Sequence, residues 1–196
     1  MPYTKRNIRT QVLKKRSQMR LAERETLSHK IANNLMDRLL PSPAAIIHSF
    51  ISHDLRQEVD TVLIQRIVGS KLPNLRWVAP RIIPGTRRME HFYWNDSTTL
   101  HTNKWGIQEP DPLLATRVEI LDIDIVLVPL LACDRRGHRV GYGGGFYDRF
   151  LAECRPEVQR IGLSFEQPLD EITDVSAWDI PLHACITPEK SFTLPY

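Results

Sequence analysis

The stretch "DIDIVLVPLLAC" (122–133) decides the fold of this 196-residue chain. Its β-branched and aliphatic residues follow one another almost without interruption, which is typical of a strand buried on both faces. Strands of this kind occur in parallel sheets that helices cover on both sides. The stretch therefore predicts the central strand of an α/β domain.

Helical patterns surround this strand. Neither Pro nor Gly interrupts 3–40, so this segment is predicted to be helical, with a break near Ser17–Leu21 left open. Apolar residues recur at helical spacing from Val59 to Ile67, in a segment that Gly69 closes. A third helix is expected at 146–153, directly after a run of glycines.

Extended patterns separate the helices, and the segment 102–112 is expected to be a loop because it contains Pro and Gly. Further strands are predicted at 44–51, 76–80, 87–95, 159–165 and 183–188. Alternation of strands and helices predicts a three-layer αβα architecture with a mostly parallel central sheet. We expect one α/β domain over 1–196, which begins with an N-terminal helical segment at about 3–40.

Composition restricts the classes of protein to consider. The chain is 42% hydrophobic and 25% charged, which is ordinary for a globular protein. Its three cysteines form no CxxC pair, which argues against a disulfide framework or a zinc cluster and suits a reducing compartment. The longest uncharged apolar run, 125–133, is far shorter than the ~20 residues of a membrane span. We therefore expect a cytoplasmic protein without a membrane partner. We also expect the chain to be a monomer.

The stretch "GHRVGYGGGFYDRFL" (137–151) contains five of the nine glycines in the chain. It follows the central strand, and ligands of parallel sheets bind beyond the carboxyl ends of strands. Glycines let a ligand approach the main chain, and the first N–H groups of the following helix attract anions, most often phosphate. With Arg139 before the glycines and Arg149 after them, the loop predicts a phosphate site.

The type of phosphate site stays open from the residues alone. A P-loop would need Gly-Lys-Ser/Thr after Gly145, and the dinucleotide fingerprint would need a third glycine where Phe146 stands. Asp148 falls in the first turn of the helix, where it would repel phosphates unless a cation such as Mg²⁺ lies between them. The alternative is a tight turn in which Asp148 only complements the helix dipole.

The positive charge of the chain is concentrated near its start. Residues 1–20 contain seven basic residues and no acidic one, whereas the formal net charge of the whole chain is only +3. On a helical wheel one sector of about 60° collects Lys5, Arg9, Arg16 and Arg20, directly beside the apolar Ile8, Val12 and Met19. We expect these charges at the rim of a packed surface, where they reach into a cleft. A solvated face or a nucleic-acid contact remains the alternative.

The segment "DRRGHRVGYGGGFYD" (134–148) resembles the signature of the 5-formyltetrahydrofolate cyclo-ligase family, D-x-x-G-x-R-[LV]-G-x-G-x-G-[FY]-Y-D. The resemblance extends to "KRNIRTQVLKKR" (5–16), "FISHDLRQEVDT" (50–61), "KWGIQEP" (104–110) and "WDIPLHACITP" (178–188). It implies a fold of the NagB/RpiA/CoA-transferase-like type. It also implies an ATP- and Mg²⁺-dependent ligase: the formyl oxygen of 5-formyltetrahydrofolate attacks the γ-phosphate, and ring closure gives 5,10-methenyltetrahydrofolate, ADP and phosphate.

The resemblance also implies roles for individual residues. ATP would be bound by Lys5, Arg9, Arg139, Val140, Gly141, Tyr142, Gly143, Gly144, Gly145, Phe146 and Tyr147. The folate, in polyglutamylated form as well, would contact Ile51, Glu58, Tyr142, Gly143, Gly144, Gly145 and Phe146. Mg²⁺ would be held by Asp148 and Asp179, and the catalytic set would be Lys5, Arg139 and Asp148. Without the resemblance, Glu58 would be interpreted as an acid at the start of a helix.

Two other functions stay open at this stage. One is a non-catalytic module that binds phosphate or nucleic acid through the basic helix, although no nucleic-acid-binding motif accompanies that helix and no nucleic-acid partner is expected. The other is a different ATP-using ligase on the same fold. Turnover of 5-formyltetrahydrofolate with ATP and Mg²⁺ separates the three.

Overall fold

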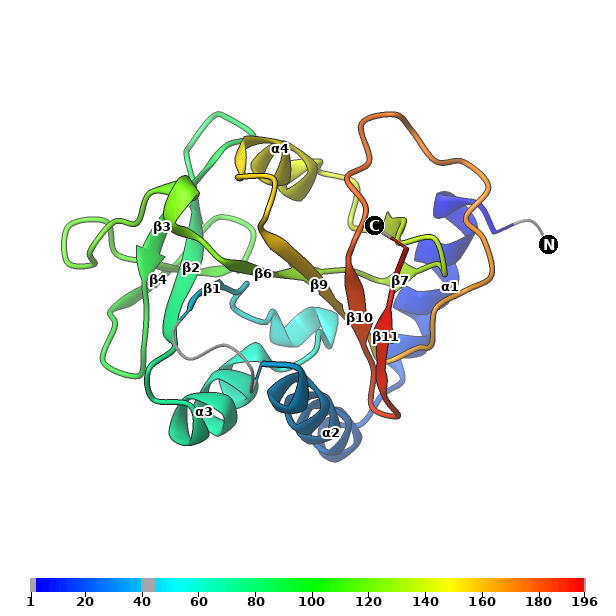
Figure 1. Ribbon diagram of the computed structural model, residues 1–196, viewed down its shortest axis with the longest axis horizontal. Coiled ribbons are helices and arrows are strands. Elements are labelled where there is room, and N and C mark those ends of the chain that lie inside the picture. Colours follow the sequence, from blue (N-terminus) through cyan, green and yellow to red (C-terminus); the bar gives the residue numbers. More distant parts are fainter. Residues whose placement is uncertain (1–2, 40–44, 196) are drawn as a thin grey trace.

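The computed structural model describes residues 3–39 and 45–195, and its centre is a seven-stranded sheet (Figure 1). The strands lie in the order β11-β10-β9-β6-β1-β2-β3. Their bounds are Ile46–His48 (β1), Arg76–Ile82 (β2), Met89–Tyr93 (β3), Ile125–Pro129 (β6), Gln159–Leu163 (β9), Ala184–Ile186 (β10) and Ser191–Thr193 (β11). The predicted central strand is confirmed, because β6 lies in the middle of the sheet.

The five inner strands are parallel and the two edge strands are antiparallel to their neighbours. β6 pairs in parallel with β1 on one side and with β9 on the other. At the edges, β3 runs antiparallel to β2, and β11 runs antiparallel to β10. Residues 125–128 of β6 are all buried, as a strand covered on both faces requires. The mostly parallel sheet is therefore confirmed.

Helices cover both faces of the sheet (Figure 1). The helices α2 (Leu21–Leu39) and α3 (Thr61–Lys71) lie on one face, where Ile31 and Ile64 pack in a cluster with sheet residues such as Leu127. The helix α4 (Phe146–Glu153) lies on the other face, where Phe150 and Leu151 join a cluster with Val126 and Val128. Alternate residues of β6 thus face opposite helical layers, and the three-layer αβα architecture is confirmed.

The N-terminal segment forms two helices, with the break at the expected place. The helix α1 (Lys5–Ser17) ends before α2 begins at Leu21, and Thr4 caps its first turn through the N–H of Asn7. α1 packs beside the main sheet, against the ribbon of β7 (Ala132–Cys133) and β8 (Arg139–Val140). Its apolar contact is Ile8, which is 3% exposed. This docking places the basic helix beside the glycine loop.

Several local predictions need correction. Gly69 does not close its helix, because α3 continues to Lys71, where the N–H of Leu72 bonds to Val68. The segment expected to be a loop contains β5 (Gln108–Pro110), which pairs in a hairpin with β4 (Leu100–Thr102) at its start. β11 and the two 3₁₀ helices η1 (Asp54–Arg56) and η2 (Ile120–Asp122) were not predicted. Leu40 and Ala44, the ends of two predicted segments, lie outside the described residues.

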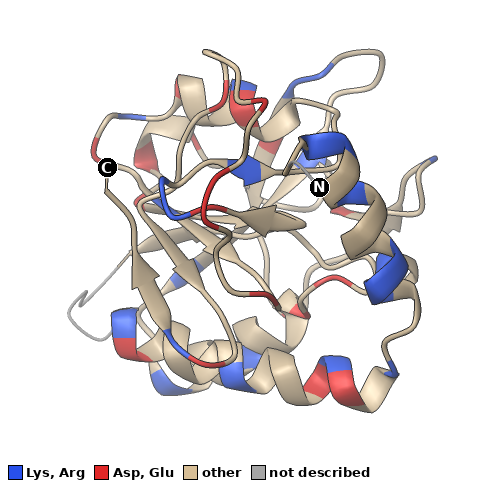
Figure 2. Ribbon diagram, turned by 90° about the vertical axis from the view of Figure 1, so that its right-hand side faces the viewer, with Lys and Arg blue, Asp and Glu red and all other residues tan. Residues whose placement is uncertain are grey.

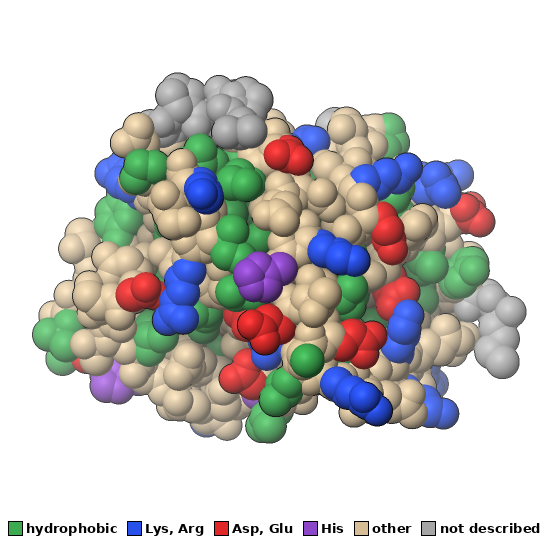
Figure 3. All heavy atoms as spheres, turned by 90° about the horizontal axis from the view of Figure 1, so that it is seen from below, with side chains coloured by type: hydrophobic (Ala, Val, Ile, Leu, Met, Phe, Trp, Pro, Cys, Tyr) green, Lys and Arg blue, Asp and Glu red, His purple; other side chains and the backbone are tan. Residues whose placement is uncertain are grey.

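The molecule presents two differently charged faces. Basic and acidic side chains are interspersed over the face that α2 and α3 form (Figure 3). In contrast, α1 carries a succession of basic bands (Figure 2). Within residues 3–39 and 45–195, no helix combines the length and the apolar character needed to cross a bilayer.

Candidate active site

A cleft of about 530 Å³ opens beside the carboxyl ends of the central strands. Phe50 and Ile51, which follow β1, form part of its wall together with Pro129 at the end of β6. Of the residues predicted to bind ATP, folate or metal, all except Val140 line this cleft. Val140 is fully buried against α1 instead, so its side chain supports the loop and does not face the cleft.

The glycine loop forms one wall of the cleft and requires glycine at two turns. Gly143 has φ 95° and Gly145 has φ 67°, in the left-handed region that other residues rarely adopt. Gly145 is the N-cap of α4 and offers no side-chain cap, so the first N–H groups of the helix remain available to a ligand. The guanidinium of Arg9 lies against Gly143. The loop thus combines open backbone donors with a fixed cation.

Two arginines of α1 hold this loop. Arg9 donates from Nε to the carbonyl of Gly141 at 2.8 Å. Arg16, which is 4% exposed, donates from Nη2 to the carbonyl of Leu130 at 2.8 Å and from Nη1 to the Tyr142 hydroxyl at 3.1 Å. The expectation that the basic sector lies at the rim of a packed surface and reaches into a cleft is therefore confirmed for Arg9. Arg16 was not among the predicted site residues, although it shares that sector.

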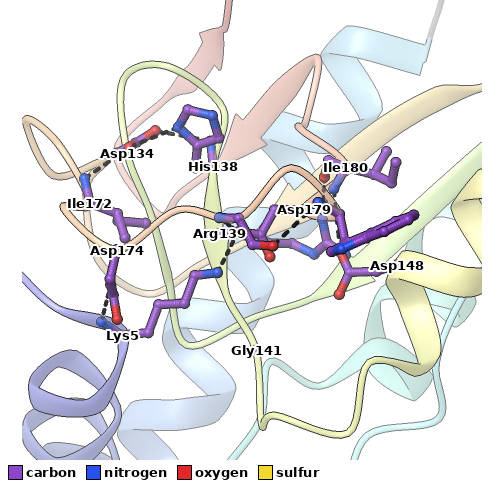
Figure 4. A network of polar contacts seen from close by, with 12 residues as sticks. Lys5, Asp134, His138, Arg139, Gly141, Asp148, Ile172, Asp174, Asp179 and Ile180 are labelled. Atoms are coloured by element: carbon purple, nitrogen blue, oxygen red, sulfur yellow. Dashed lines mark hydrogen bonds and ion pairs between the residues drawn. The ribbon is translucent and has the colours of Figure 1, made fainter.

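Four charged side chains alternate in sign at the other end of the loop (Figure 4). Lys5 forms an ion pair with Asp179. Arg139 forms one with Asp148, with 2.6 Å between Nη2 and Oδ1, and also donates to the carbonyl of Ile180. The N–H of Ile180 donates to the same Asp148 oxygen at 3.3 Å. All four residues of the predicted phosphate and metal site therefore belong to one polar network.

Burial and pairing both act on the pKa values in this network. Burial lowers the pKa of Arg139, while the carboxylates of Asp148 and Asp179 oppose that change. Burial works to raise the pKa of Asp179, yet hydrogen bonds from Lys5 and from the N–H of Ser176 hold it below its ordinary value. Asp179 is thus ionised at neutral pH, and arginine stays protonated in proteins. The network presents full charges to a ligand.

The donor set fits Mg²⁺ bound together with a nucleotide. Asp148 and Asp179 offer hard carboxylate oxygens, and Ile180 links them, since it follows Asp179 and donates to Asp148. Mg²⁺ in nucleotide sites is bound by one or two carboxylates and by substrate phosphates, seldom by an all-protein cage. The described residues accordingly contain no group of three or more His, Cys, Asp or Glu side chains that could hold a metal. Asp148 and Asp179 would hold the ion.

Glu58 stands on a different wall of the cleft, in the loop between β1 and α3. It is 7% exposed, and its Oε2 accepts a hydrogen bond from the N–H of His53 at 2.8 Å. Arg24 of α2 fixes the loop by donating to the Glu58 carbonyl at 2.6 Å and to Asp54 at 2.8 Å. The N-cap of α3 is Asp60, so the interpretation of Glu58 as a capping acid is wrong. Its carboxylate faces the cleft.

Asp134 and Gly137, the first residues of the signature, stabilise a turn and do not line the cleft. Asp134 is fully buried, and its carboxylate accepts hydrogen bonds from the N–H groups of Arg136, His138 and Ile172 (Figure 4). Gly137 has φ 88°, and a Cβ there would lie 2.7 Å from the carbonyl oxygen of Leu182. This part of the motif builds the turn between β7 and β8, which presents Arg139 to the cleft.

Two further residues that line the cleft lay outside the predicted set of site residues. Trp105 comes from the β4–β5 hairpin, and its carbonyl lies 3.2 Å from Nε2 of His53. Arg56 comes from η1 and stacks on the ring of Tyr142 at 4.7 Å. Trp105 stood in a resembling segment and so carried a signal. Arg56 also stood in a resembling segment, 50–61, but the resemblance assigned no role to it.

Comparisons with known proteins identify the family. A profile described as the 5-formyltetrahydrofolate cyclo-ligase family matches residues 2–188. The Escherichia coli K12 protein named 5-formyltetrahydrofolate cyclo-ligase is 36% identical over 98 residues, which span 50% of this chain and only 54% of that relative. The Haemophilus influenzae protein of the same name is 27% identical over 181 residues, 91% of this chain and 94% of the relative.

A solved structure agrees in fold. The NMR structure of Aquifex aeolicus 5,10-methenyltetrahydrofolate synthetase superposes with a TM-score of 0.79 at 26% identity, covering 98% of this chain and 93% of that one. The Mycoplasma pneumoniae protein titled 5,10-methenyltetrahydrofolate synthetase, at 24% identity and a TM-score of 0.72, shares the fold. With a profile match over nearly its whole length, the chain belongs to the 5-formyltetrahydrofolate cyclo-ligase family.

Proposed function

We propose that the protein converts 5-formyltetrahydrofolate into 5,10-methenyltetrahydrofolate and uses ATP and Mg²⁺ to do so. Family membership supports the folate reaction. The observation that carries the proposal is the convergence, in one cleft, of a glycine loop at a helix N-terminus, three cationic side chains and a buried carboxylate. The cationic side chains are Lys5, Arg9 and Arg139, and the carboxylate is that of Glu58.

Phosphoryl transfer requires mainly positioning and neutralisation of charge. In the proposed reaction the formyl oxygen attacks the γ-phosphorus of ATP, an O–P bond forms, and the bond to the ADP oxygen breaks. Lys5 and Arg139 neutralise the phosphate oxygens, and the N–H groups at the start of α4 donate to them. Bound Mg²⁺, held by Asp148 and Asp179, would add neutralisation of the β- and γ-phosphate charges.

Ring closure follows on the phosphorylated formyl group. The neighbouring amine nitrogen attacks the formyl carbon, the carbon–oxygen bond breaks, and phosphate leaves with the former formyl oxygen. The departing phosphate takes the electron pair of the broken carbon–oxygen bond, formally as PO₄³⁻, and gains the proton that the amine nitrogen loses. The released species is HPO₄²⁻, so the stoichiometry is balanced without a protein base. The same cations that bound ATP stabilise the departing phosphate.

The folate is oriented from the opposite wall. A carboxylate can accept two parallel N–H bonds from the amino-pyrimidine edge of a pterin, and Glu58 is a buried carboxylate in this cleft. Ile51 is 4% exposed and contributes an apolar surface beside it. The glycine loop, from Tyr142 to Phe146, would contact both substrates, because it lies between the Glu58 wall and the charged network.

We also propose that the chain acts as a single-domain monomer in the cytoplasm, without a nucleic-acid or membrane partner. Cys133, Cys154 and Cys185 are free thiols, which agrees with a reducing compartment. Polyglutamylated folates are accepted in this proposal if the tail leaves through the open side of the cleft.

The proposal is tested by mixing the purified protein with 5-formyltetrahydrofolate, ATP and Mg²⁺ and recording the near-ultraviolet absorbance of the methenyl product. Product and ADP should appear in equal amounts, and omission of ATP or addition of a chelator should stop both. Product formation without ATP would contradict the proposed phosphorylation. ATP hydrolysis without methenyl product would point to another ligase activity.

A further inference from the structure

Arg56 is a cation in the cleft to which no role has been assigned. It closes the 3₁₀ helix η1, lines the cleft, and places its guanidinium 4.7 Å from the centroid of the Tyr142 ring. Arg16 fixes the position of the Tyr142 ring by donating a hydrogen bond to its hydroxyl. Tyr142 therefore forms a platform, anchored at its hydroxyl, on which the Arg56 guanidinium rests.

The remaining cationic side chains of the cleft are already engaged. Lys5 is paired with Asp179, Arg139 is paired with Asp148, and Arg9 donates to the carbonyl of Gly141. The backbone N–H of Arg56 donates to the carbonyl of His53 at 3.1 Å, but among the described residues its guanidinium forms neither a hydrogen bond nor an ion pair. Its contact with the ring uses the face of the guanidinium and leaves the N–H groups on its edge available.

The loop that carries Arg56 is held rigidly. Gln57, the next residue, has φ 47° and ψ 49°, and it is the single non-glycine residue with positive φ in the described chain. Its backbone N–H and its side-chain amide both donate to the carbonyl of Asp54 at 2.9 Å. Strained backbone of this kind is characteristic of ligand clamps. The left-handed turn at Gln57 places its neighbours Arg56 and Glu58 together on the cleft wall.

From these contacts we propose that Arg56 is a substrate-binding residue that recognises an oxyanion. The inference rests on the proposed function, which brings two sources of oxyanions into the cleft: the carboxylates of the glutamyl group of folate and the phosphoryl groups of ATP. A stacked guanidinium with a free edge binds such groups by two parallel N–H bonds. Because the phosphate end already has Lys5, Arg9 and Arg139, the glutamyl carboxylate is the expected source.

The test compares Arg56→Met, Arg56→Lys and the wild type with three ligands. Calorimetric binding and turnover are measured for 5-formyltetrahydrofolate, for 5-formyltetrahydropteroate, which lacks the glutamyl group, and for Mg-ATP. Arg56→Met should weaken 5-formyltetrahydrofolate binding about tenfold or more, since it removes charge-assisted hydrogen bonds. Binding of the pteroate should change less than about twofold. Arg56→Lys should be intermediate, because it keeps the charge but not the planar pair of donors.

The two possible sources of the oxyanion predict different losses of affinity in Arg56→Met. Selective weakening of 5-formyltetrahydrofolate identifies the carboxylate, whereas selective weakening of Mg-ATP identifies a phosphoryl group. Unchanged binding of all three ligands would overturn the proposal. Equal weakening of all three together with a lower melting temperature would overturn it as well, because Arg56 would then only support Tyr142. Wild-type protein that binds 5-formyltetrahydrofolate without turnover would refute the proposed function but not the role of Arg56.

The chain offers a matched control at the start of β2. Arg76, the first residue of β2, stacks on the ring of Tyr93 at 5.3 Å, outside the cleft. Arg76→Met removes the same type of cation–ring contact and should leave the affinities for all three ligands within about twofold of the wild type. An equal loss in Arg76→Met and Arg56→Met would show that the effect is general.

Discussion

The guanidinium of Arg139 and the carboxylate of Asp148 form a mostly buried ion pair, with side chains 5% and 32% exposed. In the proposed reaction both groups serve the nucleotide, Arg139 through its phosphates and Asp148 through Mg²⁺. The pair therefore holds each charge in place before the ligand arrives. Binding of Mg-ATP would exchange one set of charge contacts for another, which limits the cost of desolvating the site.

Asp148→Asn should reduce turnover by at least about 100-fold while the chain still folds. The carboxylate charge for Mg²⁺ is lost, and Arg139 loses its ion pair with Asp148 but keeps its hydrogen bond to the Ile180 carbonyl. We expect the free energy of unfolding to fall by roughly 1–3 kcal/mol, since Asp148 is partly exposed and the loss is smaller than for a fully buried pair. Product absorbance and denaturant unfolding measure the two effects. Full activity in this variant would eliminate Asp148 as a metal ligand.

Lys5→Met should raise the KM for ATP about tenfold or more and leave the KM for 5-formyltetrahydrofolate nearly unchanged. The ammonium group lies in the charged network, whereas Glu58, the residue proposed to bind the folate, lies on another wall of the cleft. Lys14→Met is the control, because Lys14 is an exposed residue of the same helix. Initial rates at varied substrate concentrations give both constants. An unchanged KM for ATP would place the phosphates away from α1.

Gly137→Ala should destabilise the protein more than Gly85→Ala. Both glycines have positive φ, 88° and 77°, so both variants incur backbone strain of about 1–2 kcal/mol. Only at Gly137 would the new Cβ meet a backbone oxygen, that of Leu182 at 2.7 Å, while nothing lies within 4 Å at Gly85. Denaturant unfolding of both variants isolates the clash. Equal destabilisation would mean that the turn shifts freely.

Stability should fall as the pH is lowered from 6.5 to 4. Burial lowers the pKa of His91 from 6.5 to about 4, and Arg117 acts in the same direction. Between these values the unfolded chain binds the proton and the folded chain does not, so acidification favours unfolding, by about 3 kcal/mol for His91 at pH 4. Burial, together with His91, also lowers the pKa of His48, which steepens the loss.

Denaturant unfolding at several pH values tests this assignment with two variants. His91→Phe should flatten the pH dependence, since it removes the titrating group while an aromatic ring remains to stack on Phe150. His29→Phe serves as the control, because His29 is exposed on α2. A pH dependence as steep in His91→Phe as in the wild type would assign the acid sensitivity to other groups.

Local sequence signals predicted the elements nearest the site. The predicted helix 146–153 coincides with α4, because the glycines stop any earlier helical turn and the apolar spacing begins at Phe146. The buried strand was recognised from its composition. The position of Gly69 misled the prediction for α3, since tertiary contacts stabilise a glycine near the last turn of a helix. The β4–β5 hairpin was missed because its strands are only three residues each.

The convergence of the site was less accessible from the sequence. That Lys5 would pair with Asp179, or Arg24 would position Glu58, depends on packing between segments far apart in the chain. The resemblance named most of the residues that line the cleft. It named neither Arg56, which lines the cleft, nor Arg16, and the contacts of both with Tyr142 arise only in the folded chain. Nor did the motif show that Asp134 builds a turn while Asp148 faces the cleft.

The Lys5–Asp179 contact joins residues that are 174 positions apart. While the chain is still being synthesised, Lys5 is present before Asp179. The charged network is therefore incomplete until almost the whole chain has been made. Detachment of α1, an event much smaller than global unfolding, would dismantle the site in the same way. In the proposed function, ATP turnover would therefore require the completed fold, and immature or damaged molecules would not hydrolyse ATP without making product.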